Sequence, residues 1–166
     1  MALIDNQANE IDEIWSYPDA ADAPVQGLNY IVPWDVFTSI AAGSALERPA
    51  GVLVGPEVAP EQIASHLELI DLIVVQFPKF RDGRGFSTAR ALRQRHGFRG
   101  DIRALGHVLP DQLPLLSQCG FSSIVTPGDH PPPQWKATLP GQSLPERPQQ
   151  LLRRLVKRDL QAPRNS

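Results

Sequence analysis

Short apolar runs recur along the middle of the chain and alternate with stretches of helical periodicity. The runs begin 20–30 residues apart, at residues 52–55, 72–77, 102–107 and 122–126. A run of this length that is rich in Val, Ile and Leu is typical of a strand buried on both faces of a parallel sheet. The spacing leaves room for a crossover helix after each strand. We therefore expect four parallel strands.

The intervening segments carry helix start and stop signals. Three helices are predicted between the strands, over residues 60–70, 86–96 and 110–118. Pro60 and Pro110 suit a first helical turn, where a missing N–H costs nothing. Gly97 and Gly120 suit the left-handed residue that ends many helices.

These elements predict an α/β protein with a mostly parallel sheet of repeated βα units, either an open sheet or a partial TIM-like barrel. A complete barrel typically needs about 250 residues, and the chain has 166. A half-barrel completed by a second subunit is a further alternative. We expect one structural domain in three parts. They are an N-terminal arm with the first strand and helix (1–49), a βα core (50–126) and a Pro-rich wrap with a C-terminal helix (127–166).

The two ends of the chain differ from the core. Residues 1–28 are polar and acidic, which predicts an irregular arm with room for short strands that packs onto the domain. Seven prolines between residues 127 and 148 predict an extended segment without a helix. Residues 148–160 then show an apolar face and a basic face. That apolar face is expected to pack on the domain or on a second subunit. We expect a homo-oligomer that forms through apolar surface left by an incomplete α/β layer, with help from residues 148–160.

Composition narrows the class of function. The net charge of −2 argues against bulk nucleic-acid binding. The longest apolar stretch, 69–75, is far shorter than the roughly 20 residues that span a bilayer. Because no basic segment with an apolar run opens the sequence, we expect a soluble, cytoplasmic protein without membrane contact. The single cysteine, Cys119, excludes an internal disulfide or a cysteine-ligated cluster within the chain and is expected to be buried.

The most informative polar segment follows the second strand. Ligands of parallel α/β proteins bind at the carboxyl ends of the strands, and this loop brings three cations there, Lys79, Arg81 and Arg84. The loop leads into a helix N-terminus, which favours an anion. Three further residues fit an anion site by allowing a close backbone approach or offering a hydroxyl: Gly83, Gly85 and Ser87. The alternative is a solvated turn in which Asp82 pairs with Arg84.

A histidine lies at the end of the third strand. His107 could serve as a general acid–base or contact an anionic ligand, and it could equally bond a loop carbonyl. Further candidates near strand ends are Gln76, Asp82, Arg103 and Asp111, and Arg103 could instead pair with Asp101. No set of His, Cys and carboxylate residues has metal-ligand spacing, and no cofactor motif occurs.

Two segments resemble the signatures of a known family. They are QFPKFRDGRGFS at residues 76–87 and GDIRALGHVLPDQL at residues 100–113, and Cys119-Gly120-Phe121 forms a shorter third match. The family is a bacterial one of unknown function whose members are described as oxidoreductases involved in sulfite reduction. The resemblance covers residues 50–126, and the Pro-rich tail departs from it. It implies an association with the sirohaem-containing sulfite reductase of sulfate assimilation, and it implies no catalytic residue.

Three hypotheses follow from the sequence. The first is an accessory protein of assimilatory sulfite reduction that binds an anionic ligand, or docks on sulfite reductase, through the loop 79–85. The second is an enzyme acting on a small anion, with His107 as acid–base and Lys79 or Arg84 as an electrostatic clamp. The third is a structural dimerisation module that uses the C-terminal helix.

Overall fold

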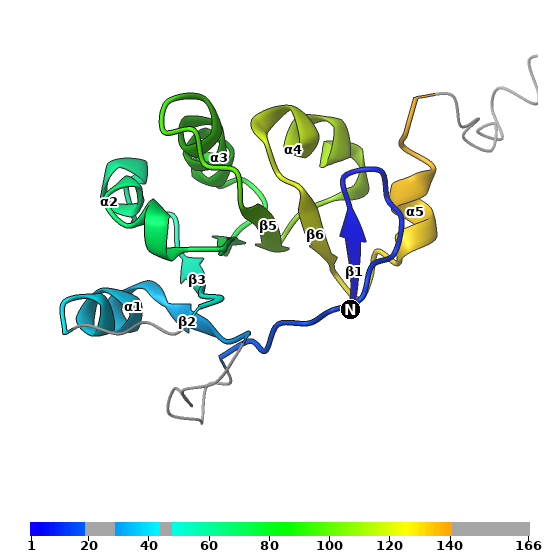
Figure 1. Ribbon diagram of the computed structural model, residues 1–166. Helices are drawn as coiled ribbons and strands as arrows, with labels where there is room; N and C mark the ends of the chain where they lie inside the picture. Colours follow the sequence, from blue (N-terminus) through cyan, green and yellow to red (C-terminus); the bar gives the residue numbers. More distant parts are fainter. Residues whose placement is uncertain (19–28, 44–47, 141–166) are drawn as a thin grey trace, which may run out of the picture.

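The computed structural model describes residues 1–18, 29–43 and 48–140 (Figure 1). The strands are β1 (Ala2–Asp5), β2 (Ile31–Pro33), β3 (Gly51–Val54), β4 (Leu72–Phe77), β5 (Asp101–Gly106) and β6 (Ser123–Thr126). The α-helices are α1 (Trp34–Ala41), α2 (Pro60–Ala64), α3 (Arg84–Gln94), α4 (Leu113–Cys119) and α5 (Pro132–Lys136). Two short 3-10 turns, η1 (Leu67–Leu69) and η2 (Pro110–Gln112), precede β4 and α4.

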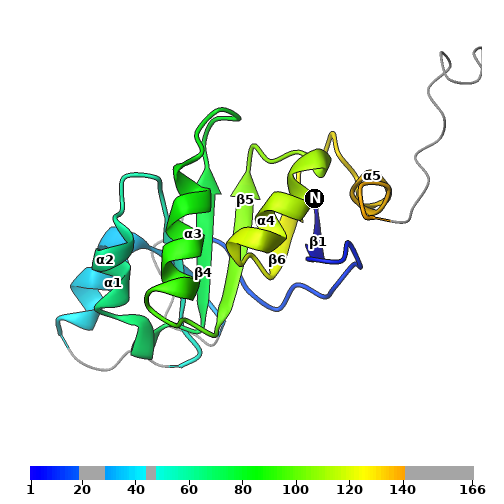
Figure 2. The ribbon, with the colours of Figure 1, turned by 90° about the horizontal axis from the view of Figure 1, so that it is seen from above.

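The strands form one open, mostly parallel sheet in the order β1-β6-β5-β4-β3-β2. Strands β2 to β6 are parallel and lie in sequence order, and β1 pairs antiparallel with β6. Helices α2, α3 and α4 cover one face, while the N-terminal segment crosses the other (Figure 1). Seen from above, α3 lies over β4, and α4 lies beside β5 and β6 (Figure 2).

The four predicted parallel strands are confirmed, with bounds shifted by at most one residue at each end. The helices differ more. The segment predicted as one helix over 60–70 divides into α2 and η1, although Ile63 and Ile70 are both buried as its stripe required. Gly120 ends α4 with φ of 99°, the left-handed conformation expected for it.

Alternation along the strands creates an apolar layer on each face of the sheet. On β4, Ile73, Val75 and Phe77 belong to the large core beneath the helices. Leu72 and Val74 face the other way and pack with Ile31 under Trp15 and Tyr17 of the N-terminal segment. The second layer explains why the run at 72–77 is almost continuously apolar.

A buried arginine fastens the N-terminal segment to the sheet. The Arg103 side chain is only 4% exposed and makes ion pairs of 2.8 Å with Glu13 and 3.2 Å with Asp101. It also donates to the Tyr17 hydroxyl at 2.9 Å and to the Ser123 hydroxyl at 3.1 Å. The pairing with Asp101 was one of the two sequence-based alternatives for Arg103.

The same N-terminal segment lies along both edges of the sheet. Glu10 forms an antiparallel bridge with Ile4 on the outer side of β1. Ser16 forms a parallel bridge with Tyr30, and the Ile31 N–H donates to the Ser16 carbonyl at 2.9 Å on the outer side of β2. The arm thus contains the short strand β1 and packs onto the domain, as the sequence allowed, and it contacts both edges.

The prediction that the Pro-rich segment after residue 126 contains no helix is wrong for α5. Pro132 and Pro133 occupy its first turn, where proline's missing N–H removes no helical hydrogen bond. Trp135 is fully buried and its indole donates to the His130 carbonyl at 2.9 Å, so tertiary packing holds the turn in place. The predicted helix over 148–160 lies outside the described residues.

Within the described residues, no helix is long and apolar enough to cross a membrane.

The Glu13–Arg103 pair should contribute measurably to stability. We expect Glu13→Gln to lower the free energy of unfolding by about 1–3 kcal/mol, because a buried guanidinium loses one of its two carboxylate partners. Glu10→Gln is the control, since this exposed neighbour makes no side-chain contact with Arg103, and it should change stability by less than about 0.5 kcal/mol. Urea unfolding followed by circular dichroism measures both. Equal effects would contradict the assigned role of the pair.

The titration of Tyr17 gives a second test of this packing. Burial raises the pKa of Tyr17 to about 12, although the Arg103 hydrogen bond opposes the shift. The folded state therefore favours the neutral phenol, and its contribution to stability is present below the unfolded pKa near 10 and is lost as pH rises through about 12. The chain has two tyrosines, so the 295 nm absorbance of wild type minus Tyr17→Phe isolates this group. A midpoint near 10 without denaturant would show that Tyr17 is not packed as described.

Candidate functional site

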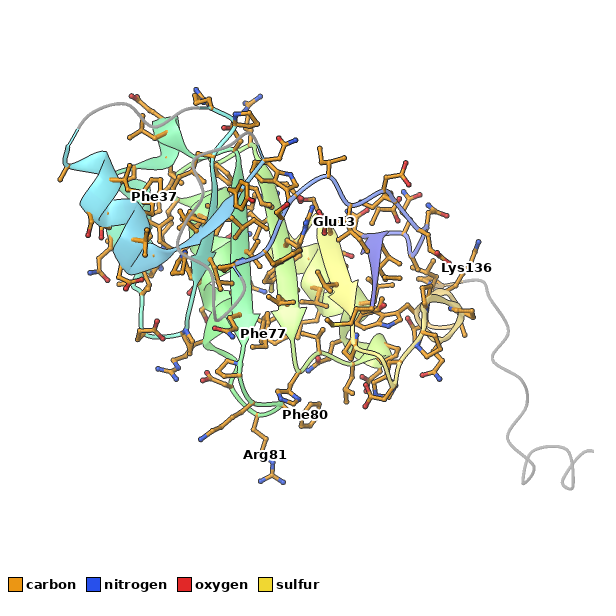
Figure 3. The ribbon with its side chains drawn as sticks, turned by 90° about the horizontal axis from the view of Figure 1, so that it is seen from below. Glu13, Phe37, Phe77, Phe80, Arg81 and Lys136 are labelled. Atoms are coloured by element: carbon orange, nitrogen blue, oxygen red, sulfur yellow. The ribbon has the colours of Figure 1, made fainter. Side chains whose placement is uncertain are left out.

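The loop between β4 and α3 projects from the carboxyl edge of the sheet. Figures 2 and 3 show it reaching beyond the strand ends, with Phe80 and Arg81 at its tip. Phe80 is 54% exposed, which is unusual for an aromatic side chain in a small domain. Lys79 and Arg81 are also exposed, and their side chains make no hydrogen bond or ion pair within the described part of the chain. The tip thus presents one aromatic ring between two free cations.

The third cation of the loop is already paired. Arg84 donates to Asp82 through Nε at 2.9 Å and through Nη2 at 2.6 Å. These hydrogen bonds are the main cause that lowers the pKa of Asp82 to about 2. The Arg84 backbone N–H also points to Asp82 Oδ1 at 3.3 Å, so the chain's own carboxylate lies at the start of α3. Of the two sequence-based alternatives for Asp82, internal pairing is the one observed.

The residues expected to admit an anion have local structural roles. Gly83 is the N-cap residue of α3, with φ of −81° and open space around it. Gly85 is buried, and a Cβ there would lie 2.6 Å from the Phe77 ring, so its missing side chain makes room for that ring. Ser87 is exposed on the helix and does not cap it, since α3 has no side-chain cap.

His107 lies at the base of the same loop. Its backbone N–H donates to the Phe77 carbonyl at 2.8 Å, and Gly106 before it adopts φ of 111°. A Cβ at Gly106 would collide with the Phe77 carbonyl oxygen, so this close approach requires glycine. The imidazole of His107 is exposed and no described side chain bonds or orients it.

The remaining candidates do not join this loop. Asp111 is exposed in η2. Gln76 is exposed and, by alternation along β4, faces away from the helices opposite Leu105. Arg103 is buried beneath the N-terminal segment, where it serves packing. Among the described residues, no three His, Cys, Asp or Glu side chains converge as a metal site would require.

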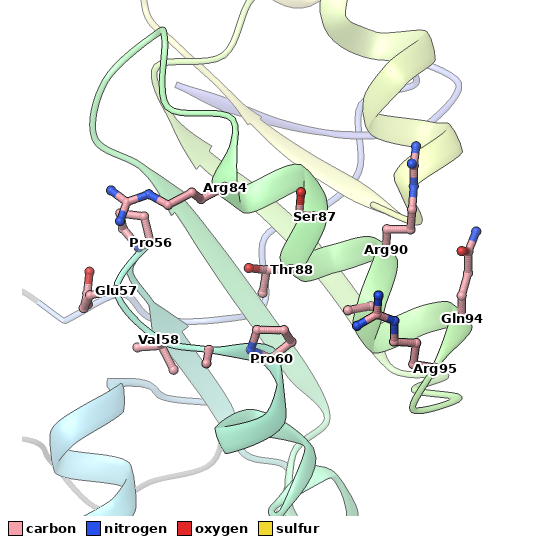
Figure 4. Close-up of a pocket in the computed structure, with 12 residues that line it drawn as sticks. Pro56, Glu57, Val58, Pro60, Arg84, Ser87, Thr88, Arg90, Gln94 and Arg95 are labelled. Carbon is pink, nitrogen blue, oxygen red and sulfur yellow. The ribbon is translucent and has the colours of Figure 1, made fainter.

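A groove of about 510 Å³ lies between α3 and the segment that joins β3 to α2 (Figure 4). Pro56, Val58 and Pro60 form one wall. On the other wall, Arg84 and Arg95 lie at opposite ends with Thr88 between them (Figure 4).

We expected Arg84 and Ser87 in the loop site, and the groove was not predicted. The signal was present in α3, since positions 84, 88, 91 and 95 follow the 4-3-4 spacing of one helix face. The facing wall lies more than 20 residues earlier, in a segment whose sequence shows only turn residues and a helix start. Only the fold brings the two walls together.

One protein family matches a residue range that extends beyond the predicted βα core. A family model described as "Bacterial protein of unknown function (DUF934)" matches residues 51–145, which is more than half of the chain. No curated protein matches. The matched range contains the projecting loop, both walls of the groove and α5.

The two glycines of the loop give a matched pair of substitutions. Gly85→Ala should destabilise the fold by about 1–3 kcal/mol, because the new methyl group must displace the Phe77 ring. Gly83→Ala should stay within about 0.5 kcal/mol, since its φ suits alanine and nothing lies within 4 Å of the new atom. Urea unfolding measures both. If the two variants lost equal stability, the contact between Gly85 and Phe77 would not explain the glycine.

Proposed function

The chain belongs to the bacterial family of unknown function DUF934, and we propose that it is an accessory protein of assimilatory sulfite reduction that docks on sulfite reductase through the loop 79–85. The observation that carries this proposal is the tip of that loop. It holds an aromatic side chain that is 54% exposed, between two cations without partners in the described chain.

The form of the loop favours docking over capture of a small anion. A site for a small ion is concave and its donors converge, whereas Phe80 and Arg81 point outward from a projecting tip (Figure 3). Arg84, the cation nearest the helix N-terminus, already has its charge balanced by Asp82 at 2.6 Å. A small anion would have to compete with that carboxylate.

The side chains at the tip of the loop indicate which groups the partner surface would carry. Aromatic and arginine side chains supply most of the binding energy in many protein interfaces. Phe80 would fill an apolar pocket of the partner protein, and Lys79 and Arg81 would lie against acidic groups at the rim of that pocket. Such charges speed association and make it sensitive to salt. The identity of the partner rests on the resemblance of residues 76–87 to the sulfite-reduction family, and in this proposal the redox chemistry belongs to sulfite reductase.

The other two hypotheses stay predictions. No described group favours His107 as a catalytic base, because its imidazole has no orienting partner. Self-association through residues 148–160 concerns a segment outside the described residues. Completion of a half-barrel by a second copy also stays a prediction.

Binding to purified sulfite reductase tests the docking proposal. Biolayer interferometry should give a saturable response that weakens as salt rises from 50 to 300 mM. Phe80→Ser and the double variant Lys79→Glu, Arg81→Glu should each weaken binding by about tenfold or more, as expected for truncated interface anchors. Arg99→Glu is the control, because this exposed arginine lies between α3 and β5, at the opposite edge of the sheet.

Two outcomes would contradict docking through this loop. One is the absence of binding by the wild type, and the other is equal weakening by the control.

A separate melting experiment addresses the small-anion alternative. If sulfite or sulfate raised the melting temperature above chloride at matched ionic strength, and Arg84→Ala abolished the difference, the loop would be an anion site instead.

A further inference from the structure

The groove beside α3 is lined by a mostly buried threonine whose hydroxyl has no hydrogen-bond partner among the described residues. Thr88 is 7% exposed, and its side chain lines the groove. No hydrogen bond joins its hydroxyl to any described residue. Other hydroxyls in the helical segments behave differently, since Ser117 donates to the Leu113 carbonyl at 3.0 Å and Thr138 to the Trp135 carbonyl at 2.8 Å.

The hydroxyl oxygen is not sealed from solvent, since among the described residues only His96 Nε2 is a fully buried side-chain atom without a partner. The Thr88 hydroxyl is therefore accessible from the groove. The Thr88 hydroxyl does not bond back to its own helix, and it faces the groove (Figure 4). A molecule in the groove would complete it.

The charges at the groove define that molecule further. Its lining includes three arginines and one carboxylate, Glu57. Arg84 is held by Asp82, and Arg90 extends toward α4, where its Nη2 lies 3.5 Å from Cys119 Sγ. The Arg95 guanidinium is the one that remains without a partner among the described residues, and it lies at the groove (Figure 4).

The distance between these groups sets the size of the ligand. Thr88 and Arg95 are seven residues apart along α3 and its end, which is about 10 Å along a helix axis. This spacing favours an elongated ligand over a small inorganic ion. The lining of the groove is apolar at Val58, Pro60 and Ala91.

We infer that this groove is a binding site for an elongated organic anion. A carboxylate, sulfonate or phosphate ester lies beside Arg95, an apolar or aromatic body packs between Pro60 and Ala91, and a second acceptor receives the Thr88 hydrogen bond. The volume of about 510 Å³ lies within the range of small-molecule sites. The site is separate from the tip of the docking loop and goes beyond the proposed function.

The probe 4-methylumbelliferyl phosphate has each of these features, with a phosphate ester, a flat aromatic body and a carbonyl acceptor at the far end. Isothermal titration calorimetry should show saturable binding to the wild-type chain. Arg95→Ala and Thr88→Val should each weaken binding by about tenfold or more, the loss that corresponds to one hydrogen bond with a charged or buried partner. Thr88→Ser keeps the hydroxyl and should bind within about threefold of wild type.

Three controls make the result specific. The neutral analogue 7-methoxy-4-methylcoumarin lacks the anion and should bind at least about tenfold more weakly. Arg99→Ala removes an exposed arginine outside the groove and should leave binding unchanged. Phe80→Ser should also leave it unchanged, which separates this site from docking on sulfite reductase.

The inference would be overturned by the absence of saturable binding at millimolar probe, by equal affinity for the neutral analogue, or by unchanged affinity in Arg95→Ala. Circular dichroism checks that Thr88→Val folds. Should it not fold, Arg95→Ala alone decides, because an exposed side chain at the end of α3 can be truncated without disturbing the core.

Discussion

Five parallel strands lie side by side in sequence order. This order determines which face of the sheet the helices cover, which face the N-terminal segment covers, and the edge where the loop projects. Because parallel crossovers are right-handed, strands added in one direction place their helices on the same face of the sheet. The opposite face therefore needs another cover. The N-terminal segment supplies it, and Arg103 is the polar anchor within an otherwise apolar contact. The same order brings the carboxyl ends of β3 to β6 to a single edge, where the projecting loop begins.

The parts of the fold that depend on local sequence were predictable. Each buried strand appears as an apolar run, and Gly120 marks a helix end by its own conformational freedom. The pairing of Asp82 with Arg84 was foreseen as an alternative because the two residues are neighbours in the chain. The parallel direction of the strands followed from the lengths of the segments between them.

The parts that were missed depend on contacts between distant residues. Glu13 and Arg103 are 90 positions apart, so the sequence could not show that this arginine is buried. The helix α5 begins with Pro132 and Pro133, which suit a first turn, and the buried Trp135 holds it against the domain. Gly85 was interpreted as room for a ligand, and the space is taken by the Phe77 ring instead. The groove beside α3 needs two walls that only the folded chain brings together.

The bridges at Glu10 and Ser16 also limit the pairing of the sheet's edge strands with other chains. A strand at the edge of a sheet offers unpaired N–H and C=O groups, and another chain can extend the sheet by pairing with them. Here the first sixteen residues bond along the outer sides of both β1 and β2. The N-terminal segment thus acts as an internal guard against intermolecular β-pairing and the aggregation that follows from it.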